Sequence, residues 1–341
     1  MLDIIHTVSR ETGKTLRGYY IMTYDVLQDV IAGDVLTDRS ASGAERPWRG
    51  KRRATELLAL AYADVDAHKA QRLSSCATQL GFALCEGGCK RLVSANFCRV
   101  RLCPMCTWRR GLKVYSQARQ IVERLDGYVY LFVTLTVRNV AGGELSAAID
   151  GLFAAWDRFS RRARIARAWC GGMRTMEITH NVDPRSKDYN TYHPHLHVLV
   201  AVRRGYFSGR NYITQAEYTA LWRAAARLDY DPIVHVERCK STTAAALAEC
   251  CKYSVKDADY ILPDDWDLTC DTVRILDAAL HRRRLVSWFG VFSDVRRSLA
   301  LDDAEDGDLV AVGDDDVGAD ELGRVYYAWV GGYAQQYYRC K

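Results

Sequence analysis

Three histidines fall within five positions of the 341-residue chain, at His193, His195 and His197. The apolar run at residues 196–202 is typical of a β-strand, whose side chains alternate between the two faces of a sheet. His195 and His197 are therefore expected to share a face, where two imidazoles provide half of a divalent-metal site. Pro194 leaves the direction of His193 open, because proline limits strand pairing. The alternative is a set of half-buried histidines on a polar sheet face.

A third ligand is expected from a strand predicted at residues 173–180, which a polar loop joins to the histidine strand. Because such a connection favours antiparallel neighbours, Glu177 can face the same surface as His195 and His197. A carboxylate beside two imidazoles gives three ligands and leaves open positions for water or a phosphate oxygen. Two alternatives stay open: Glu177 as a surface carboxylate, and His180 either as a ligand or as a polar residue at a loop end.

A cysteine cluster precedes these strands. Cys103 and Cys106 form a C-x-x-C knuckle, whose two thiolates can hold one tetrahedral Zn²⁺. A redox C-x-x-C would be expected at the start of a helix that follows a strand in a thioredoxin-like unit, and that context is missing. Cys76 is a further candidate ligand. We predict a structural zinc site made by four of five cysteines: Cys85, Cys89, Cys98, Cys103 and Cys106.

A tyrosine could act as the nucleophile at the predicted metal site. Residues 242–260 are expected to form a helix, in which Glu249, Tyr253 and Lys256 share one face at 3.6 residues per turn. Tyrosine can attack a phosphodiester if a cation polarises the phosphate. The alternative is a tyrosine that packs on the sheet beside a surface ion pair. The sequence pattern alone does not favour either the nucleophile or the packing tyrosine.

Charge is unevenly distributed along the chain. The net charge is +5, yet residues 301–323 hold ten acids and no Lys or Arg, so the rest of the chain carries +15. A body this basic suggests a polyanionic partner, with nucleic acid the first candidate. The acidic segment is predicted to be a mobile, solvated loop; DNA mimicry and self-inhibition are the alternatives.

Basic residues are concentrated on a helix that follows the cysteine knuckle. Between Arg99 and Arg119 there are six basic residues and no acid. Such a helix suits contacts with DNA phosphates, although an exposed solubilising face has the same composition. The residues expected to contact DNA are Arg99, Arg101, Arg109, Arg110 and Lys113.

The chain has twelve cysteines, no apolar signal segment near residue 1 and no stretch long enough to span a membrane. We therefore expect a soluble cytoplasmic protein, in which cysteines are metal ligands and free thiols rather than disulfides. Composition and hydrophobic periodicity predict strands near residues 128–137, 173–180, 196–202, 232–237 and 285–292, with helices near 108–124, 144–169, 214–228 and 272–284.

Taken in order, these motifs resemble a known family. Phe132-Val133-Thr134-Leu135-Thr136, His195-Leu196-His197 and Lys252-Tyr253-Ser254-Val255-Lys256 are similar to the three motifs of HUH endonucleases. Cys98-x4-Cys103-Pro104-x-Cys106-x2-Arg109-Arg110 and Glu249-x3-Tyr253-x2-Lys256 more closely resemble rolling-circle plasmid replication initiators of the pC194/pUB110 type. The resemblance runs from about residue 72 to residue 292. The long N-terminal segment, Cys85, Cys89 and the acidic insert depart from it.

The resemblance implies an α+β fold: a central antiparallel sheet of about five strands, helices on one face and the catalytic metal on the other, plus a Cys-rich zinc subdomain. It implies nicking and joining of one DNA strand at a plasmid double-strand origin, through a 5′-phosphotyrosine that leaves a 3′-OH primer. Tyr253 would be the nucleophile and Glu249 a general base for terminating cleavage. Lys252 and Lys256 would stabilise charge, and Mg²⁺ or Mn²⁺ would bind His195, His197 and Glu177.

The implied partners are origin DNA with a hairpin and a single-stranded nick site, a host helicase and a DNA polymerase; self-association stays open. The expected divisions are an accessory segment (1–70), a zinc and basic-helix region (71–125), the catalytic domain (126–300), the acidic loop (301–324) and a Tyr-rich segment (325–341). The rival functions are an HUH transposase or relaxase, which shares the chemistry, and a non-catalytic zinc-dependent DNA-binding regulator.

Overall fold

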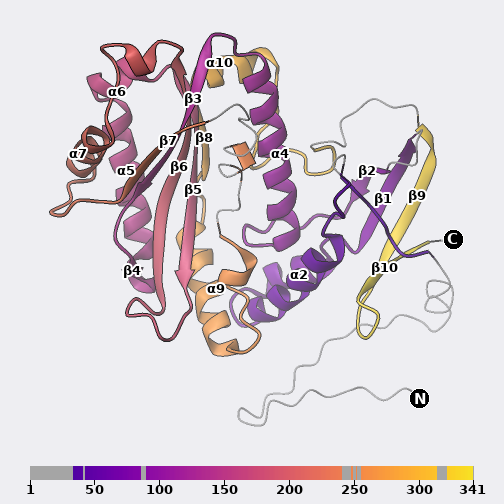
Figure 1. The fold of residues 1–341 in the computed structure, drawn as a ribbon. Coiled ribbons are helices and arrows are strands. Elements are labelled where there is room, and N and C mark those ends of the chain that lie inside the picture. Colours follow the sequence, from indigo (N-terminus) through magenta and orange to yellow (C-terminus); the bar gives the residue numbers. More distant parts are fainter. Residues whose placement is uncertain are drawn as a thin grey trace, which may run out of the picture.

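The computed structural model of the protein describes residues 34–40, 43–85, 90–239, 247–248, 251, 255–312 and 321–340. Its largest element is a six-stranded antiparallel sheet, in which β7, β3, β6, β5 and β8 lie side by side in that order and β4 also pairs with β6 (Figure 1). The five predicted strands are all present, which confirms the expected antiparallel sheet. The strands are β3 (Tyr128–Thr136), β4 (Val140–Ala141), β5 (Gly171–Asn181), β6 (Thr191–Arg203), β7 (Val234–Arg238) and β8 (Val286–Gly290).

The central strand β6 carries the histidine cluster. On one side of β6, His195 pairs with Thr136 at the end of β3, and Tyr192 pairs with Val140 of β4. Pro194 lies between these two contacts, where neither strand is paired with it. On this side of β6 the residue that lacks a backbone N–H therefore stands at a break in the ladder, whereas on the other side it is the register partner of Ile178 of β5.

One face of this sheet is covered by α5 (Leu145–Ser160), α7 (Gln215–Ala226) and α9 (Trp266–Leu280), with the short α6 (Ala163–Ala168) beside them (Figure 1). Phe159 of α5 meets Trp222 of α7 edge to face, with ring centroids 5.6 Å apart. Alternate residues of the strands complete this core, because a β-strand turns every second side chain to the same face. The helices expected on one face are thus confirmed.

The opposite face carries both a second core and the metal ligands. Helices α4 (Pro104–Glu123) and α10 (Val291–Ser298) cover one end of it, packing on Tyr130, Leu199 and Ala201. His195 and His197 lie on the same side of β6 as Leu199, toward the other end. The sequence did not indicate that two helices also lie on this face, and they bring the basic helix close to the central sheet.

A smaller antiparallel sheet, in the order β10-β9-β1-β2, lies on the far side of α2 and α4 from the central sheet (Figure 1). The Tyr-rich segment supplies two of its strands, and Val35 bridges to Tyr338 on its edge. The elements of this part are α2 (Trp48–Tyr62), α3 (Ala67–Ser75), β1 (Gln79–Cys85), β2 (Lys90–Ala95), β9 (Glu321–Val330) and β10 (Gln336–Arg339). Short 3₁₀ turns η1, η2 and η3 occupy Gly142–Glu144, Tyr206–Ser208 and Asp257–Asp259. Among the described residues, no helix combines the length and apolarity needed to cross a membrane.

Candidate active site and metal centres

Glu177, His195 and His197 converge on the sheet face opposite α5, at the end that α4 and α10 do not cover. Glu177 of β5 is the direct cross-strand partner of His195, so the antiparallel register brings them together. The Nε2 atom of His197 lies 3.0 Å from Glu177 Oε2 and 3.1 Å from His195 Nε2, and His195 Nε2 lies 3.6 Å from Glu177 Oε2. Neighbouring ligands of an octahedral ion with bonds of about 2.1 Å are about 3.0 Å apart, so the three atoms fit one cation.

Both imidazoles are oriented by their other ring nitrogen. His195 Nδ1 donates to the carbonyl oxygen of His193 at 3.1 Å, and His197 Nδ1 lies 3.1 Å from the Thr134 hydroxyl. The ring of Phe132 stacks on His197 with centroids 5.2 Å apart. This arrangement directs each Nε2 atom to the position that a cation would occupy, and such hydrogen bonds to the other ring nitrogen are the usual support of a metal-binding histidine. His193 therefore contributes to the site through its backbone carbonyl.

The ionisation of Glu177 suits a metal ligand. Burial alone would raise the pKa of this carboxyl group, but hydrogen bonds and charge from His195 and His197 outweigh burial and lower the pKa well below its usual range. Lys256 Nζ adds positive charge 3.7 Å from Glu177 Oε1. Because its pKa is lowered, the carboxylate stays ionised throughout the neutral range, where a divalent cation needs a charged ligand.

His180 does not join the three ligands. Its Nδ1 atom lies 2.9 Å from the carbonyl oxygen of Asp259, and its Nε2 atom lies 3.0 Å from Asn190 Oδ1. The imidazole also stacks on Tyr192 with centroids 4.4 Å apart. Each ring nitrogen thus has a partner within the protein, and His180 holds the chain that follows Tyr253 rather than a cation.

The predicted nucleophile segment is described in part. Glu249, Lys252 and Tyr253 lie outside the described residues, whereas Lys256 lies beside Glu177. The helix expected through residue 260 does not extend that far, because Lys256 is extended (φ −73°, ψ 141°) and a 3₁₀ turn follows. Helix propensity favoured the alanine-rich sequence, but side-chain contacts made by residues 256–260 hold this end in another conformation.

Four cysteines form a second candidate metal centre, at Cys76, Cys98, Cys103 and Cys106. The sulfur of Cys76 lies 3.6 Å from that of Cys103 and 3.7 Å from that of Cys106, and Cys98 lies 3.7 Å from Cys106. A tetrahedral zinc site with Zn–S bonds of about 2.3 Å has sulfur atoms about 3.8 Å apart, so the four thiols fit Zn²⁺.

Backbone and side-chain groups around the cluster favour thiolates. The amide of Arg99 donates to Cys106 Sγ at 3.2 Å, and that of Cys98 donates to Cys76 Sγ at 3.4 Å. Among the thiols themselves, hydrogen bonds lower the pKa of Cys103 against the effect of burial, whereas hydrogen bonds to Cys103 and Cys106 raise the pKa of Cys76 and of Cys98. A buried group of four sulfurs with amide donors is typical of a structural metal site.

The ligand set differs from the predicted one by a single residue. Cys98, Cys103 and Cys106 are in the cluster as predicted, and Cys76 at the end of α3 completes it. Cys85 ends β1 and Cys89 follows in the connection to β2; the Cys85 side chain and Cys89 lie outside the described residues. Four coordination positions are filled without them, so we correct the predicted set to include Cys76.

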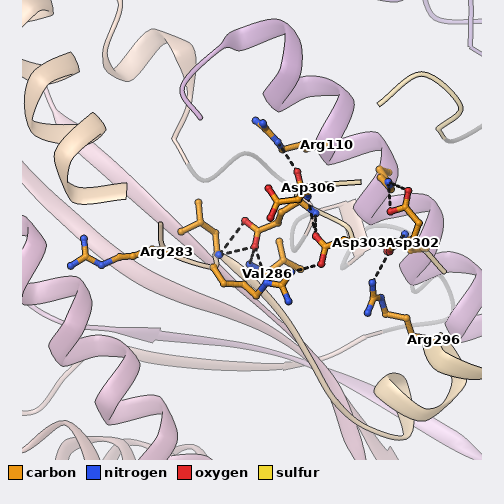
Figure 2. Close-up of polar contacts among 12 residues, drawn as sticks. Arg110, Arg283, Val286, Arg296, Asp302, Asp303 and Asp306 are labelled. Atoms are coloured by element: carbon orange, nitrogen blue, oxygen red, sulfur yellow. Dashed lines mark hydrogen bonds and ion pairs between the residues drawn. The ribbon is translucent and has the colours of Figure 1, made fainter. Parts of the chain in front are cut away.

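Residues 302–312, hereafter the acidic strap, lie against the basic helix α4 (Figure 2). Lys113 Nζ is 2.6 Å from Asp302, and Arg109 donates to the carbonyl oxygens of Leu309 and Val310 at 3.0 and 2.6 Å. The other contacts of the predicted DNA-binding residues are Arg99 to Asp306 O, Arg101 to Glu305 Oε1 and Arg110 to Glu305 O. The expected DNA-binding cations therefore face acceptors of the chain itself.

These contacts correct two expectations. Arg109 and Lys113 are buried and are not accessible to a phosphate in this conformation, whereas DNA contact by Arg99, Arg101 and Arg110 stays a prediction. The strap is not a mobile loop, because Leu309 and Val312 are buried with it; residues 313–320 lie outside the described residues and residues 321–324 begin β9. Carboxylates placed beside buried cations remove the cost of burying those charges unpaired.

Glu305 joins the strap to both α4 and the central sheet. Its side chain is 6% exposed, accepts from Arg101 at 2.7 Å, and accepts from the amide of Leu285 at 3.1 Å, next to β8. We expect Glu305→Gln to lower the free energy of unfolding by roughly 1–3 kcal/mol, because the half-buried Arg101 loses its counter-charge and an NH₂ donor replaces one of the two acceptor oxygens that face the buried Leu285 amide. Denaturant titration measures this. The matched control is Asp306→Asn on the exposed side of the strap; an equal loss in both variants would contradict the role of Glu305.

The protein has an α+β fold with an antiparallel central sheet, and it has two candidate metal centres. One is made by two histidines and a carboxylate on the sheet, and the other is a cluster of four cysteines. Comparison with known proteins then gives the family. The family model described as "Replication protein" matches residues 89–338, and the chain belongs to this family. The predicted resemblance is thereby confirmed.

Relatives cover most of the chain. A "Protein rep" of Bacillus amyloliquefaciens is 38% identical over 315 residues, covering 83% of this chain and 90% of that protein. A "Protein rep" of Streptococcus pneumoniae serotype 2 is 36% identical, covering 82% and 88%. A "Replication protein" of Staphylococcus aureus is 35% identical over 223 residues, covering 63% and 92%. No solved structure matches the chain significantly.

Proposed function

We propose that the chain initiates rolling-circle plasmid replication by nicking and rejoining one DNA strand at the double-strand origin, through a 5′-phosphotyrosine on Tyr253. The observation that carries this proposal is the convergence of Glu177, His195 and His197 with Lys256. Lys256 Nζ is 3.7 Å from Glu177. Tyr253 is three residues before Lys256, so its backbone lies within about 11 Å of that residue.

The proposed chemistry uses a divalent cation and a phenol. A bound Mg²⁺ or Mn²⁺ supplies Lewis-acid polarisation of the scissile phosphate. Glu177, His195 and His197 hold the cation position, with His197 oriented by Thr134. The Tyr253 oxygen bonds to phosphorus, the bond from phosphorus to the 3′ oxygen breaks, and a free 3′-OH remains for a polymerase.

Other residues have supporting roles in the proposal. Lys256 and Lys252 stabilise negative charge on the phosphate or phenolate. Glu249 acts as a general base for water in the terminating cleavage. The energy of the broken phosphodiester is retained in the phosphotyrosine, so the strand can be rejoined without ATP. Arg99, Arg101 and Arg110 contribute to binding of origin DNA, and a host helicase and polymerase act on the product in the cytoplasm.

The experiment that tests the function incubates the full chain with labelled single-stranded origin DNA and Mn²⁺. We expect a covalent protein–DNA adduct that resists denaturation, that Tyr253→Phe abolishes and that a chelator of the divalent cation prevents. Tyr333→Phe is the matched control, because Tyr333 is 90% exposed and far from the site in sequence. Origin binding with no adduct from the unsubstituted protein would favour a non-catalytic DNA-binding regulator, and cleavage of transposon or transfer-origin DNA alone would favour the other HUH enzymes.

A further inference from the structure

Residues 255–261, hereafter the anchor segment, begin two residues after Tyr253 and are fixed to the central sheet. Val255 and Ile261 are buried at its two ends. Between them, Lys256 lies beside Glu177, and the carbonyl oxygen of Asp259 faces His180 Nδ1 at 2.9 Å. The segment is thus held at the edge of the metal site from its C-terminal side.

The anchor segment is also tied to the four-cysteine cluster by its last aromatic residue. The Tyr260 hydroxyl donates to the carbonyl oxygen of Leu102 at 2.6 Å, and Tyr260 is buried. Leu102 is the residue before Cys103, whose thiol belongs to the cluster. A buried hydroxyl that loses its partner is costly, so this contact fixes the segment firmly against the cluster.

A second link runs through α2. Lys51 Nζ is 2.8 Å from Asp257 Oδ2. One helical turn further along α2, the Thr55 hydroxyl donates to the carbonyl oxygen of Lys51 at 2.7 Å and lies 3.7 Å from Cys103 Sγ. Both links therefore start at the anchor segment and end at Cys103 or its immediate neighbour.

We infer that the four-cysteine cluster positions the anchor segment, and with it Lys256, beside Glu177, and that the nucleophile of the proposed function depends on this placement. The inference rests on the proposed function for the role of Tyr253. In-line attack depends strongly on geometry, and a shift of about 1 Å can cost about 100-fold in rate. Tyr260 and Lys51 are accordingly positioning residues, since they act through Leu102 and Asp257.

The test compares two tyrosines in matched settings. Tyr260→Phe removes the hydroxyl bonded to Leu102. Tyr337→Phe is the control, since Tyr337 is also buried and its hydroxyl also donates at 2.6 Å to a carbonyl beside a cluster cysteine, that of Ala77 next to Cys76. Lys51→Met is the second variant, which breaks the other link and keeps the test decisive if Tyr260→Phe does not fold.

Two readouts separate positioning from general damage. Hydrogen exchange of the amides of Asp259, Tyr260 and Ile261, which donate to Lys256 and Asp257, is expected to accelerate at least tenfold in Tyr260→Phe and Lys51→Met. The maximal rate of adduct formation is expected to fall about 10–100-fold, with the apparent Kd for Mn²⁺ and the KM for the oligonucleotide unchanged.

The outcomes are distinct. Unchanged exchange and adduct rate in both variants, or the same changes in Tyr337→Phe, would overturn the inference. Reduced Mn²⁺ affinity in step with the lost rate would also overturn it, since the variant would then act on the metal site. Absence of any adduct from the unsubstituted protein would refute the proposed function instead, while the exchange data would still report whether the cluster holds the anchor segment.

Discussion

Replacing His197 by alanine is expected to lower the rate of DNA nicking by about three orders of magnitude while origin binding is retained. His197 Nε2 lies within 3.1 Å of both other ligand atoms, so it stands at the centre of the three-ligand set. Under the proposed function, its loss would remove the Lewis acid from the scissile phosphate, and a contribution of about 4 kcal/mol to the barrier corresponds to about 1,000-fold in rate.

The measurement for this variant pairs single-turnover nicking with Mn²⁺ titration. His235→Ala is the matched control: His235 lies on β7 in the same sheet, opposite Thr134, and its side chain is 60% exposed. We expect the control to bind Mn²⁺ and to nick normally. A His197→Ala protein that nicks at the original rate, with Mn²⁺ affinity intact, would show that the cation is held elsewhere.

Cys103→Ser is expected to have the largest effect on stability. Cys103 is fully buried, caps the start of α4 and is within 3.6 Å of the Cys76 sulfur. A structural zinc contributes on the order of 10 kcal/mol to folding in small zinc domains, and serine is a far weaker ligand than thiolate. The small sheet, α2 and the first turns of α4 should lose their fixed packing when the metal is lost.

Zinc content by mass spectrometry and thermal unfolding of the full chain measure this effect. Cys340→Ser is the control, because Cys340 is an exposed cysteine outside the cluster. We expect one bound zinc per chain in the unsubstituted protein and the control, and none in Cys103→Ser. A Cys103→Ser protein that keeps its zinc and its melting temperature would contradict the assignment of the cluster.

The central sheet and the two-histidine site could be predicted from the sequence, because their signals are local. Tyr128–Thr136 is β-branched and aromatic, and the spacing of His195 and His197 fixes their common face. The loop between β5 and β6 predicts antiparallel pairing, and the register then sets Glu177 opposite His195. Each of these predictions depends only on residues close together in the sequence and on the two-residue period of a β-strand.

The remaining features depend on contacts between distant residues. Cys76 lies before β1 and Cys98 lies after β2, and the antiparallel pairing of the two strands brings these cysteines together. Recognition of that hairpin would have selected Cys76 over Cys85 and Cys89. Composition alone predicts that the acidic strap is solvated, whereas Asp302 meets the buried Lys113 and Glu305 meets the half-buried Arg101, each about two hundred positions earlier in the chain. Tertiary contacts of this kind leave no periodic signal.

The order in which the small sheet is synthesised has a consequence for when the protein becomes active. β1 begins at Gln79, but its partner β9 begins only at Glu321, so β1 keeps an unpaired edge until the ribosome has made the last part of the chain. Such distant pairing is slow to form. A nascent chain therefore lacks the complete small sheet, which lies next to the four-cysteine cluster, until β9 has been synthesised; under the proposed function, DNA cleavage would follow that step.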